Sequence, residues 1–207
     1  MRQDNMHEAL MKSAIRVVAE QGIHKATTKA LSKSSGVNEA YIYRLFGGKE
    51  DLLKKTFASL DAELVDFWQD EIAHVKKMPG DTRQIGTQVT QDLWRFVQRD
   101  REKCLFFIGY YYSHYYMEDY SAEERKHAYE PVLLQLDAYM IDGEEAWEAV
   151  NHIYDVVFPT ASRVLRGEIE NNPTLEKNVC RRVYAFLEPI LVHPASTPDY
   201  REEGNIS

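Results

Sequence analysis

The chain has few of the features that mark extracellular or membrane-spanning proteins. It contains only two cysteines in 207 residues, Cys104 and Cys180, without a Cys-x-x-Cys spacing. We therefore expect neither a disulfide framework nor a zinc site, and interpret both thiols as buried small hydrophobic groups. No apolar run approaches the length needed to cross a bilayer, and the first residues lack the apolar core of a signal peptide. These absences predict a cytoplasmic protein without a membrane partner.

Signatures of catalysis are also missing from the sequence. There is no nucleophile elbow, phosphate-binding glycine loop, catalytic carboxylate pair or metal-ligand constellation. His114 and Glu118 have a helical spacing that some metal sites use. The same applies to His152 and Asp155, but two ligands do not make a site, and ordinary polar pairing explains both pairs. We expect no enzymatic activity, no cofactor and no metal.

Alternating strand patterns are absent, whereas apolar residues recur at helical spacing through most of the chain. We expect a break or kink at Pro159, and helix caps at Asp81 or Thr82 and in the box that begins at Ser121. The sequence predicts an all-α protein of about nine helices. They are expected over residues 6–21, 27–35, 39–45, 49–77, 82–98, 102–118, 121–140, 144–169 and 174–192.

Charge is divided unevenly along the chain, whose net charge is −8. Residues 1–56 carry ten Lys/Arg against six Asp/Glu, a net of +4, which leaves fifteen against twenty-seven, a net of −12, for residues 57–207. A basic segment can neutralise phosphates, while an acidic remainder is repelled from a duplex. A solvated acidic surface alone is common, but together with the motif described next the asymmetry favours a molecule that approaches DNA with its N-terminal segment.

Residues 27–46 have the pattern of a helix-turn-helix. Thr27 or Thr28 can cap a short helix, and Gly36 can take the left-handed conformation that ends it. Asn38 is a strong cap for a second helix. Two short helices joined by a tight glycine-containing turn are typical of DNA-reading proteins, in which the second helix is the reader. The residues of this helix expected to face the core are Ile42, Leu45 and Phe46.

The motif and its surroundings resemble the TetR family of bacterial transcriptional regulators. The resemblance lies in a threonine pair, in Gly36-Val37-Asn38, and in the segments 42–46 and 49–53. It covers roughly the first quarter of the chain, and the remainder is similar in length, helical character and order of elements. Ser32 and Ser35 stand where the family usually has alanines.

The resemblance implies a domain organisation. We expect a three-helix helix-turn-helix DNA-binding headpiece over residues 1–55 and a helical ligand-binding and dimerisation domain over residues 56–193. Residues 194–207 have few apolar anchors and are expected to form a flexible tail.

Position in the motif implies which side chains touch DNA. A reading helix uses its outward side chains for base edges, while flanking hydroxyls, amides and lysines bind phosphates. The expected base-edge residues are Glu39, Ala40, Tyr41 and Arg44, with Lys29 at a family position that can reach a base. The expected phosphate contacts are Thr28, Asn38, Tyr43 and Lys49. Any single one could instead be a half-buried aromatic or a solvated cation, and Arg44 could bind phosphate, but the shared spacing favours the set.

Aromatic residues occupy every face of a helix expected over residues 102–118, so this helix must be largely enclosed. An aromatic pocket with a few hydroxyls suits a planar or amphipathic small molecule. A core helix whose tyrosines form hydrogen bonds internally or across a dimer is about equally compatible with the pattern. The candidate pocket residues are Trp94, Phe107, Tyr110, Tyr111, His114, Trp147, Tyr154 and Phe158.

The last two helices commonly form a four-helix bundle with a second subunit in the TetR family, although packing within one chain also explains their apolar face. The candidate interface residues are Val157, Val164, Val179, Val183, Phe186, Leu187 and Ile190. A palindromic operator requires two readers related by symmetry, which favours the homodimer. We expect a sequence-specific transcriptional regulator, a repressor released from double-stranded operator DNA by an unknown small-molecule effector in the C-terminal domain. The alternative is a C-terminal domain that binds a protein partner.

Overall fold

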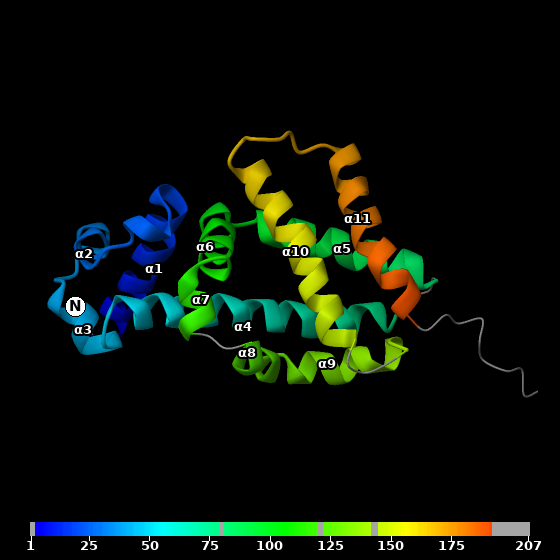
Figure 1. Ribbon diagram of the computed structural model, residues 1–207, viewed down its shortest axis with the longest axis horizontal. Helices are drawn as coiled ribbons and strands as arrows, with labels where there is room; N and C mark the ends of the chain where they lie inside the picture. The colour runs from blue at the N-terminus through cyan, green and yellow to red at the C-terminus, as the bar shows by residue number, and fades with distance from the viewer. Residues whose placement is uncertain (1–2, 79–80, 120–121, 142–144, 192–207) are drawn as a thin grey trace, which may run out of the picture.

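The computed structural model describes residues 3–78, 81–119, 122–141 and 145–191. Throughout these ranges the chain is helical, and the only β-type pairing among them is an isolated antiparallel bridge between Met140 and Leu191. Figure 1 shows an elongated molecule with a small three-helix headpiece at one end and the remaining helices, here called the body, along the rest. The all-α prediction is confirmed.

The headpiece helices end where the sequence predicts. Thr27 caps α2, because its side-chain oxygen accepts a hydrogen bond from the Ala30 N–H at 3.1 Å. Gly36 ends α2 at φ +70°, a conformation that glycine adopts without strain. Asn38 caps the following turn by accepting from the Ala40 N–H at 2.9 Å. The elements are α1 (Gln3–Gln21), η1 (Ile23–Lys25), α2 (Thr28–Ser35) and α3 (Ala40–Phe46).

One long helix joins the headpiece to the body. It is α4 (Lys49–Val75), and it buries a stripe of apolar side chains along its length. The next helix, α5 (Thr82–Gln98), is capped by Asp81, whose carboxylate accepts from the Gln84 N–H at 2.8 Å. Because α4 contacts both the headpiece and the body, a shift of this helix would displace residues in both.

Two helices predicted as continuous are divided, so the described residues contain eleven α-helices rather than nine. The first division falls at Tyr112 and Ser113, where the Ser113 hydroxyl donates to the Tyr110 carbonyl at 2.7 Å and the chain turns. The second falls at Tyr129, because Pro131 lies at the start of the next helix and cannot continue the ladder before it. The resulting elements are α6 (Arg101–Tyr111), α7 (His114–Asp119), α8 (Ala122–Ala128), α9 (Glu130–Leu136) and η2 (Asp137–Tyr139).

The last helices are α10 (Glu145–Leu165) and α11 (Pro173–Leu187). Pro159 lies within α10 without splitting it. Asn172 caps α11, and Pro189 in the short η3 (Glu188–Ile190) ends it earlier than the predicted residue 192. The capping box at Ser121 and the tail over residues 194–207 lie outside the described residues.

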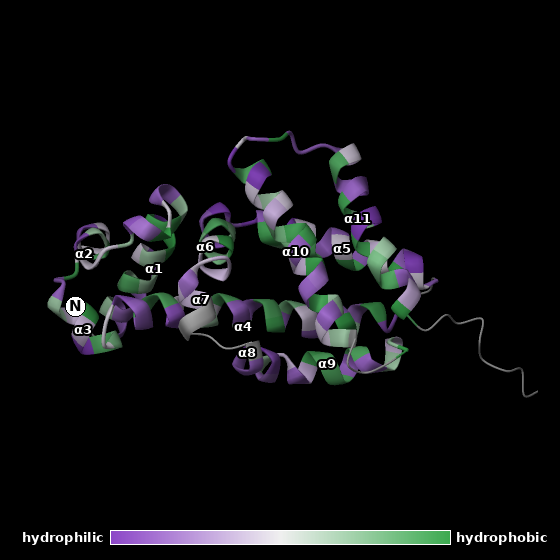
Figure 2. Cartoon of the chain, in the orientation of Figure 1, coloured by the Kyte–Doolittle hydropathy of each residue, from purple (hydrophilic) through white to green (hydrophobic). Residues whose placement is uncertain are grey.

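The core runs without interruption from headpiece to body and includes Cys104, and Cys180 is also buried. Figure 2 shows hydrophobic stretches on the inner faces of the body helices, whereas α8 is drawn mostly as hydrophilic. No helix in the described ranges is both long and apolar enough to span a membrane.

Candidate functional site

The turn between α2 and α3 is held by side chains that local sequence supplies. The Ser32 hydroxyl donates to the Val37 carbonyl at 2.7 Å, and Ser35 accepts from the Val37 N–H at 3.1 Å. Thr28 donates to the carboxylate of Glu39, which joins the two helices directly. The serines that replace the usual alanines therefore brace the turn.

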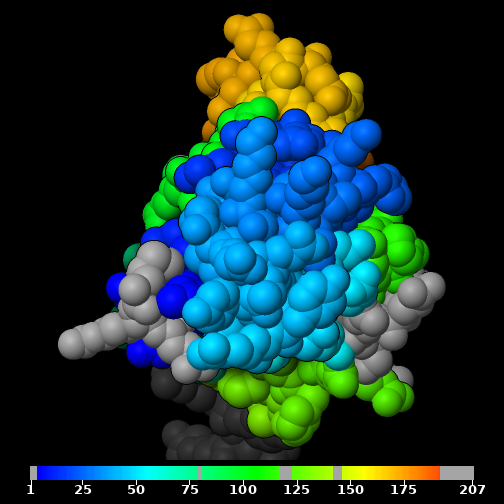
Figure 3. Space-filling model, turned by 90° about the vertical axis from the view of Figure 1, so that its left-hand side faces the viewer, coloured from blue at the N-terminus to red at the C-terminus, as the bar shows by residue number. Residues whose placement is uncertain are grey.

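The outer face of α3 is open to solvent, and Figure 3 looks onto this end of the molecule. Tyr43 is 57% exposed, and the Arg44 guanidinium lies over the Tyr41 ring, 4.9 Å from its centre. Ile42 and Phe46 are buried and Leu45 is half-buried, so the inner face packs as predicted. Of the predicted DNA contacts, Lys29, Asn38, Ala40, Tyr43 and Arg44 are exposed, and Thr28, Glu39, Tyr41 and Lys49 are partly buried.

Among the predicted DNA contacts, Lys49 is bonded to a residue of the body. It donates to the Tyr115 hydroxyl at 2.7 Å and lies 3.4 Å from a carboxylate oxygen of Glu50. Tyr115 belongs to α7, so this bond joins the first residue of α4 to the body.

The predicted aromatic pocket is filled by a protein side chain, Arg125. Its guanidinium carbon lies 5.1–5.9 Å from the centres of five rings, which we call the aromatic box: Phe107, Tyr111, Tyr129, Trp147 and Tyr154. Among the predicted pocket residues, Trp94, Phe107, Tyr110, Tyr154 and Phe158 are buried, Tyr111 and Trp147 are half-buried, and His114 is exposed. Of the two interpretations left open by the sequence, a pocket wall or a packed core helix, the space enclosed by the five rings of the box agrees with the packed core, because Arg125 occupies it.

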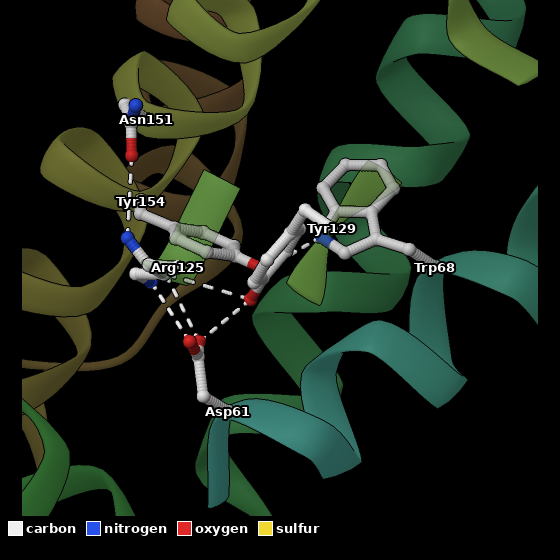
Figure 4. Close-up of polar contacts among 6 residues, drawn as sticks. All are labelled: Asp61, Trp68, Arg125, Tyr129, Asn151 and Tyr154. Atoms are coloured by element: carbon white, nitrogen blue, oxygen red, sulfur yellow. Dashed lines mark hydrogen bonds and ion pairs between the residues drawn. The ribbon is translucent and has the colours of Figure 1, made fainter. Parts of the chain in front are cut away.

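Arg125 is fully buried and forms a bidentate pair with Asp61 (Figure 4). Its Nε lies 2.9 Å from one carboxylate oxygen and its Nη2 3.1 Å from the other. Its Nη1 donates to the side-chain oxygen of Asn151 at 3.2 Å. Burial alone would lower the pKa of Arg125, but Tyr129 and Asp61 outweigh it and raise that pKa, so the group remains a cation.

Hydroxyl groups complete the network around this pair. Tyr129 donates to Asp61 at 2.7 Å and its oxygen lies 2.9 Å from that of Tyr154. The Trp68 indole donates to Tyr154 at 2.6 Å. Burial raises the pKa of Tyr154, so this hydroxyl stays protonated. The body thus encloses one positive and one negative charge in a fully bonded polar centre.

Two small cavities flank this centre. The first, of about 200 Å³, lies between α4, α5, α6 and α10, and the predicted pocket residues Phe107 and Phe158 line it. The second, here called the distal cavity, is also about 200 Å³ and lies between α4, α5, α10 and α11, away from the headpiece. Its lining is almost wholly apolar and includes Trp68, Ile72, Val89 and Ile153.

Glu71 is the acidic member of the distal cavity lining. Glu71 is 8% exposed, and its Oε1 has no hydrogen-bond partner. Burial raises the pKa of this carboxyl to about 7, and the nearby Asp92 carboxylate adds to the rise. Near neutral pH the carboxyl of Glu71 is therefore partly protonated. No set of three or more His, Cys, Asp or Glu side chains in the described ranges is arranged to hold a metal ion.

The predicted dimer face is only partly available at the surface. Val157 and Val183 have no exposed area in the single chain, and Val179 and Leu187 are also buried, so they pack within the protomer. A side chain without exposed area cannot add buried area at a subunit contact, which corrects that part of the prediction. Phe186 is 36% exposed, and Val164 and Ile190 are partly exposed.

Comparison with known proteins identifies the headpiece. Residues 10–56 match the sequence model of the family described as bacterial regulatory proteins, tetR family. The headpiece of this chain is thus similar to that of TetR-family regulators. The HTH-type transcriptional regulator BetI of Rhizobium meliloti (strain 1021) is 36% identical over 69 residues, which are 33% of this chain and 32% of that protein. The fatty acid metabolism regulator protein of Bacillus subtilis (strain 168) is 29% identical over 63 residues, 30% of this chain and 32% of that protein. The match thus spans about a third of each curated relative.

Solved TetR-family structures share the fold over most of the chain. A TetR family transcription regulator from Marinobacter aquaeolei VT8 superposes with a TM-score of 0.67 at 18% identity, covering 92% of this chain and 99% of that one. FadR from Bacillus subtilis, solved in complex with stearoyl-CoA, superposes with a TM-score of 0.55 at 16% identity, covering 85% and 96%. At these identities the comparison establishes the TetR-family architecture of headpiece and body.

Sequence reasoning missed the residues at the centre of the body. Asp61, Trp68, Arg125 and Tyr129 were in none of the predicted sites, although three of them bond directly to one another. A usable signal was Arg125 itself, in a segment whose other side chains are mostly charged. Its burial follows from α8 packing across α4, which local patterns do not encode.

Proposed function

We propose that the chain is a sequence-specific DNA-binding transcriptional regulator that uses α3 as its reading helix. The exposed outer face of α3, held by a braced turn on a buried inner face, is the observation that carries this proposal. The predicted contacts on α2 and α3 are adjacent there, and hydroxyl, amide and guanidinium groups among them suit phosphates and base edges. Similarity of the headpiece to TetR-family regulators supports the same function.

A carboxylate placed on the reading face tests this role. DNA would first be selected from a random duplex pool by the wild-type chain, and affinity for the selected sequence measured by fluorescence anisotropy. Ala40→Asp should abolish detectable binding to every sequence, because a carboxylate at this exposed position of α3 would face the negatively charged DNA. The matched control is Ala73→Asp, at an exposed position near the body end of α4. Equal affinity of the two variants would refute the assignment of α3.

We further propose that the regulator binds its operator as a homodimer through α10 and α11. The partly exposed Val164, Phe186 and Ile190 are the predicted interface residues that retain surface for such a contact. Phe186→Glu should shift the sedimentation of the chain from dimer to monomer and weaken binding to a palindromic site. Leu134→Glu, which also places a carboxylate at an exposed apolar position, is the control. A monomeric wild-type chain would contradict this arrangement.

The effector site proposed here is the distal cavity. FadR of Bacillus subtilis was solved with stearoyl-CoA, but a cavity of about 200 Å³ is below the roughly 300–1,000 Å³ of most ligand pockets. An apolar cavity of about 150 Å³ can hold benzene. The size therefore supports a small apolar effector of about one ring, whose binding would favour a state of α4 that separates the headpieces and releases the operator.

Filling the cavity tests the effector proposal. Benzyl alcohol is a suitable probe because it offers one ring and one hydroxyl. It should raise the unfolding midpoint of the wild-type chain and weaken DNA binding, and Ala149→Leu, which occupies cavity space, should lose both effects. Ala185→Leu at the exposed surface is the control. A probe that binds in the cavity and leaves DNA affinity unchanged would remove the cavity from the mechanism.

A further inference from the structure

The groups around Arg125 are those that recognise organic cations in general. A carboxylate meets the guanidinium edge at 2.9 and 3.1 Å, and the guanidinium carbon lies over five aromatic rings, within 5.9 Å of their centres. Aromatic boxes of this kind bind ammonium and guanidinium groups that have been removed from water. We propose that Asp61 and the aromatic box form a binding site for a small organic cation, and that Arg125 is its built-in, replaceable occupant.

The attachment of α8 makes this replacement feasible. Arg125 is the only buried side chain among those described on α8, and the side chains of residues 123, 124 and 126–128 are exposed. The ion pair of Glu124 with Lys54 spans 3.6 Å at the surface, where such pairs contribute little. In Figure 1 α8 lies on the outside of α4. From there Arg125 reaches between α4 and α10, where it meets Asp61 and Asn151. Withdrawal of the Arg125 side chain would therefore loosen α8, which stays joined to the body through Tyr129 and α9.

The charge of the site also fits an exchange of occupants. An incoming monovalent cation replaces one positive charge beside Asp61, so the buried carboxylate is never left unpaired. A guanidinium ligand could form the same two bonds to Asp61 and lie against the same rings. Because the ligand is not tethered, α8 would be loosened while α4 and α10 keep their contacts with the box. Intramolecular competition from Arg125 lowers the apparent affinity, since the ligand binds only the fraction of molecules in which the box is vacant.

This site is separate from the proposed effector cavity, although Trp68 contacts both. Trp68 lines the distal cavity, and its indole donates to Tyr154 of the aromatic box. Cation binding at the aromatic box does not depend on DNA binding, and it is measured without DNA. If the chain did not regulate through DNA, cation binding at the aromatic box could still occur. If the box bound no cation, the proposed regulatory function would be unaffected.

Ethylguanidinium chloride is the probe, because it has the end of an arginine side chain, and ethylurea is its neutral counterpart of the same shape. Titration of the wild-type chain, followed by tryptophan fluorescence at balanced ionic strength, should give saturable binding of the cation and none of ethylurea. Amide hydrogen exchange of residues 122–128 should accelerate on binding, while that of residues 150–157 stays constant. Arg125→Ala should bind ethylguanidinium about ten-fold more tightly or better, and Lys126→Ala should match the wild type.

Two results would overturn the proposal. Saturable binding to Arg125→Ala with none to the wild type would mean that Arg125 never leaves and that the box is a structural socket. Wild-type binding that Trp147→Leu does not weaken would place the cation elsewhere. If Arg125→Ala fails to fold, the wild type and Trp147→Leu still decide the question, because Trp147 is half-buried at the edge of the box and carries no charge.

Discussion

Two arginines, each lying against a tyrosine ring, show how differently the headpiece and the body use charge. Arg44 lies 4.9 Å from the ring centre of Tyr41 on an exposed helix face, and Arg125 lies 5.2 Å from that of Tyr111 with no exposed surface at all. The headpiece keeps its cation in water, where it remains available to an external anion. The body has satisfied its cation internally with Asp61. The same side chain thus serves recognition in one region and cohesion in the other.

The largest effect should come from breaking the buried pair. Asp61→Ala leaves the Arg125 guanidinium without its counter-charge in the core, which should lower the free energy of unfolding by about 3–5 kcal/mol. Urea denaturation measures this. The control is Glu63→Ala on the same helix, whose exposed pair with Lys103 should be worth at most about 1 kcal/mol. Equal losses in the two variants would contradict the contrast between buried and exposed charge.

Removing the headpiece arginine should affect recognition instead of stability. Arg44→Ala should weaken binding to the selected DNA by about 1–3 kcal/mol and relax preference at one base pair, if the guanidinium reads a base edge. Its urea midpoint should remain at the wild-type value because the side chain is exposed. Uniform weakening across all sequences would identify Arg44 as a phosphate contact. A large loss of stability in Arg44→Ala would mean that Arg44, like Arg125, stabilises the fold.

The buried carboxyl of Glu71 gives the body a dependence on pH near neutrality. Its pKa is raised from 4.5 to about 7 by burial and by Asp92, against the opposing effect of Arg95. The folded chain therefore holds this proton more tightly than the unfolded chain does. The resulting stabilisation is fully present below the unfolded pKa and is lost as pH rises through the folded pKa.

Urea denaturation of the wild type and of Glu71→Gln over a pH series measures this dependence. We expect the stability of the wild type relative to the variant to fall between about pH 5 and about pH 8. Asp92, Arg95 and the other surface groups are common to both proteins, so their titration largely cancels in the difference. A difference independent of pH would mean that Glu71 titrates normally.

The smallest expected effect concerns Lys49, which joins the two regions. If Lys49 also contacts a phosphate, Lys49→Ala should reduce the log-log salt slope of DNA binding by about 0.9. Tyr115→Phe removes its hydroxyl partner and keeps the cation, so the slope should not change. A slope unaffected in Lys49→Ala would assign this residue to the contact with α7 alone.

How much the sequence predicted follows from the distance between interacting residues along the chain. The caps Thr27 and Asn38 and the end at Gly36 act over two to five residues, so local pattern sufficed for the headpiece. The break at Tyr129 was missed although Pro131 signals it, because the capping pattern before it favoured one long helix. The aromatic helix was correctly predicted to be enclosed, but what encloses it was not.

The sequence by itself determined the all-α class, the helix-turn-helix and the division into a basic headpiece and an acidic body, because propensities, caps and charge counts are local or additive quantities. Only the tertiary structure decided that Arg125 lies inside the aromatic box and that the distal cavity lies beside Glu71. Asp61 and Arg125 are 64 residues apart, and their contact depends on how α8 packs on α4. A buried charge is stable only when an opposite charge pairs with it. When that partner is distant in the sequence, no local pattern predicts the contact.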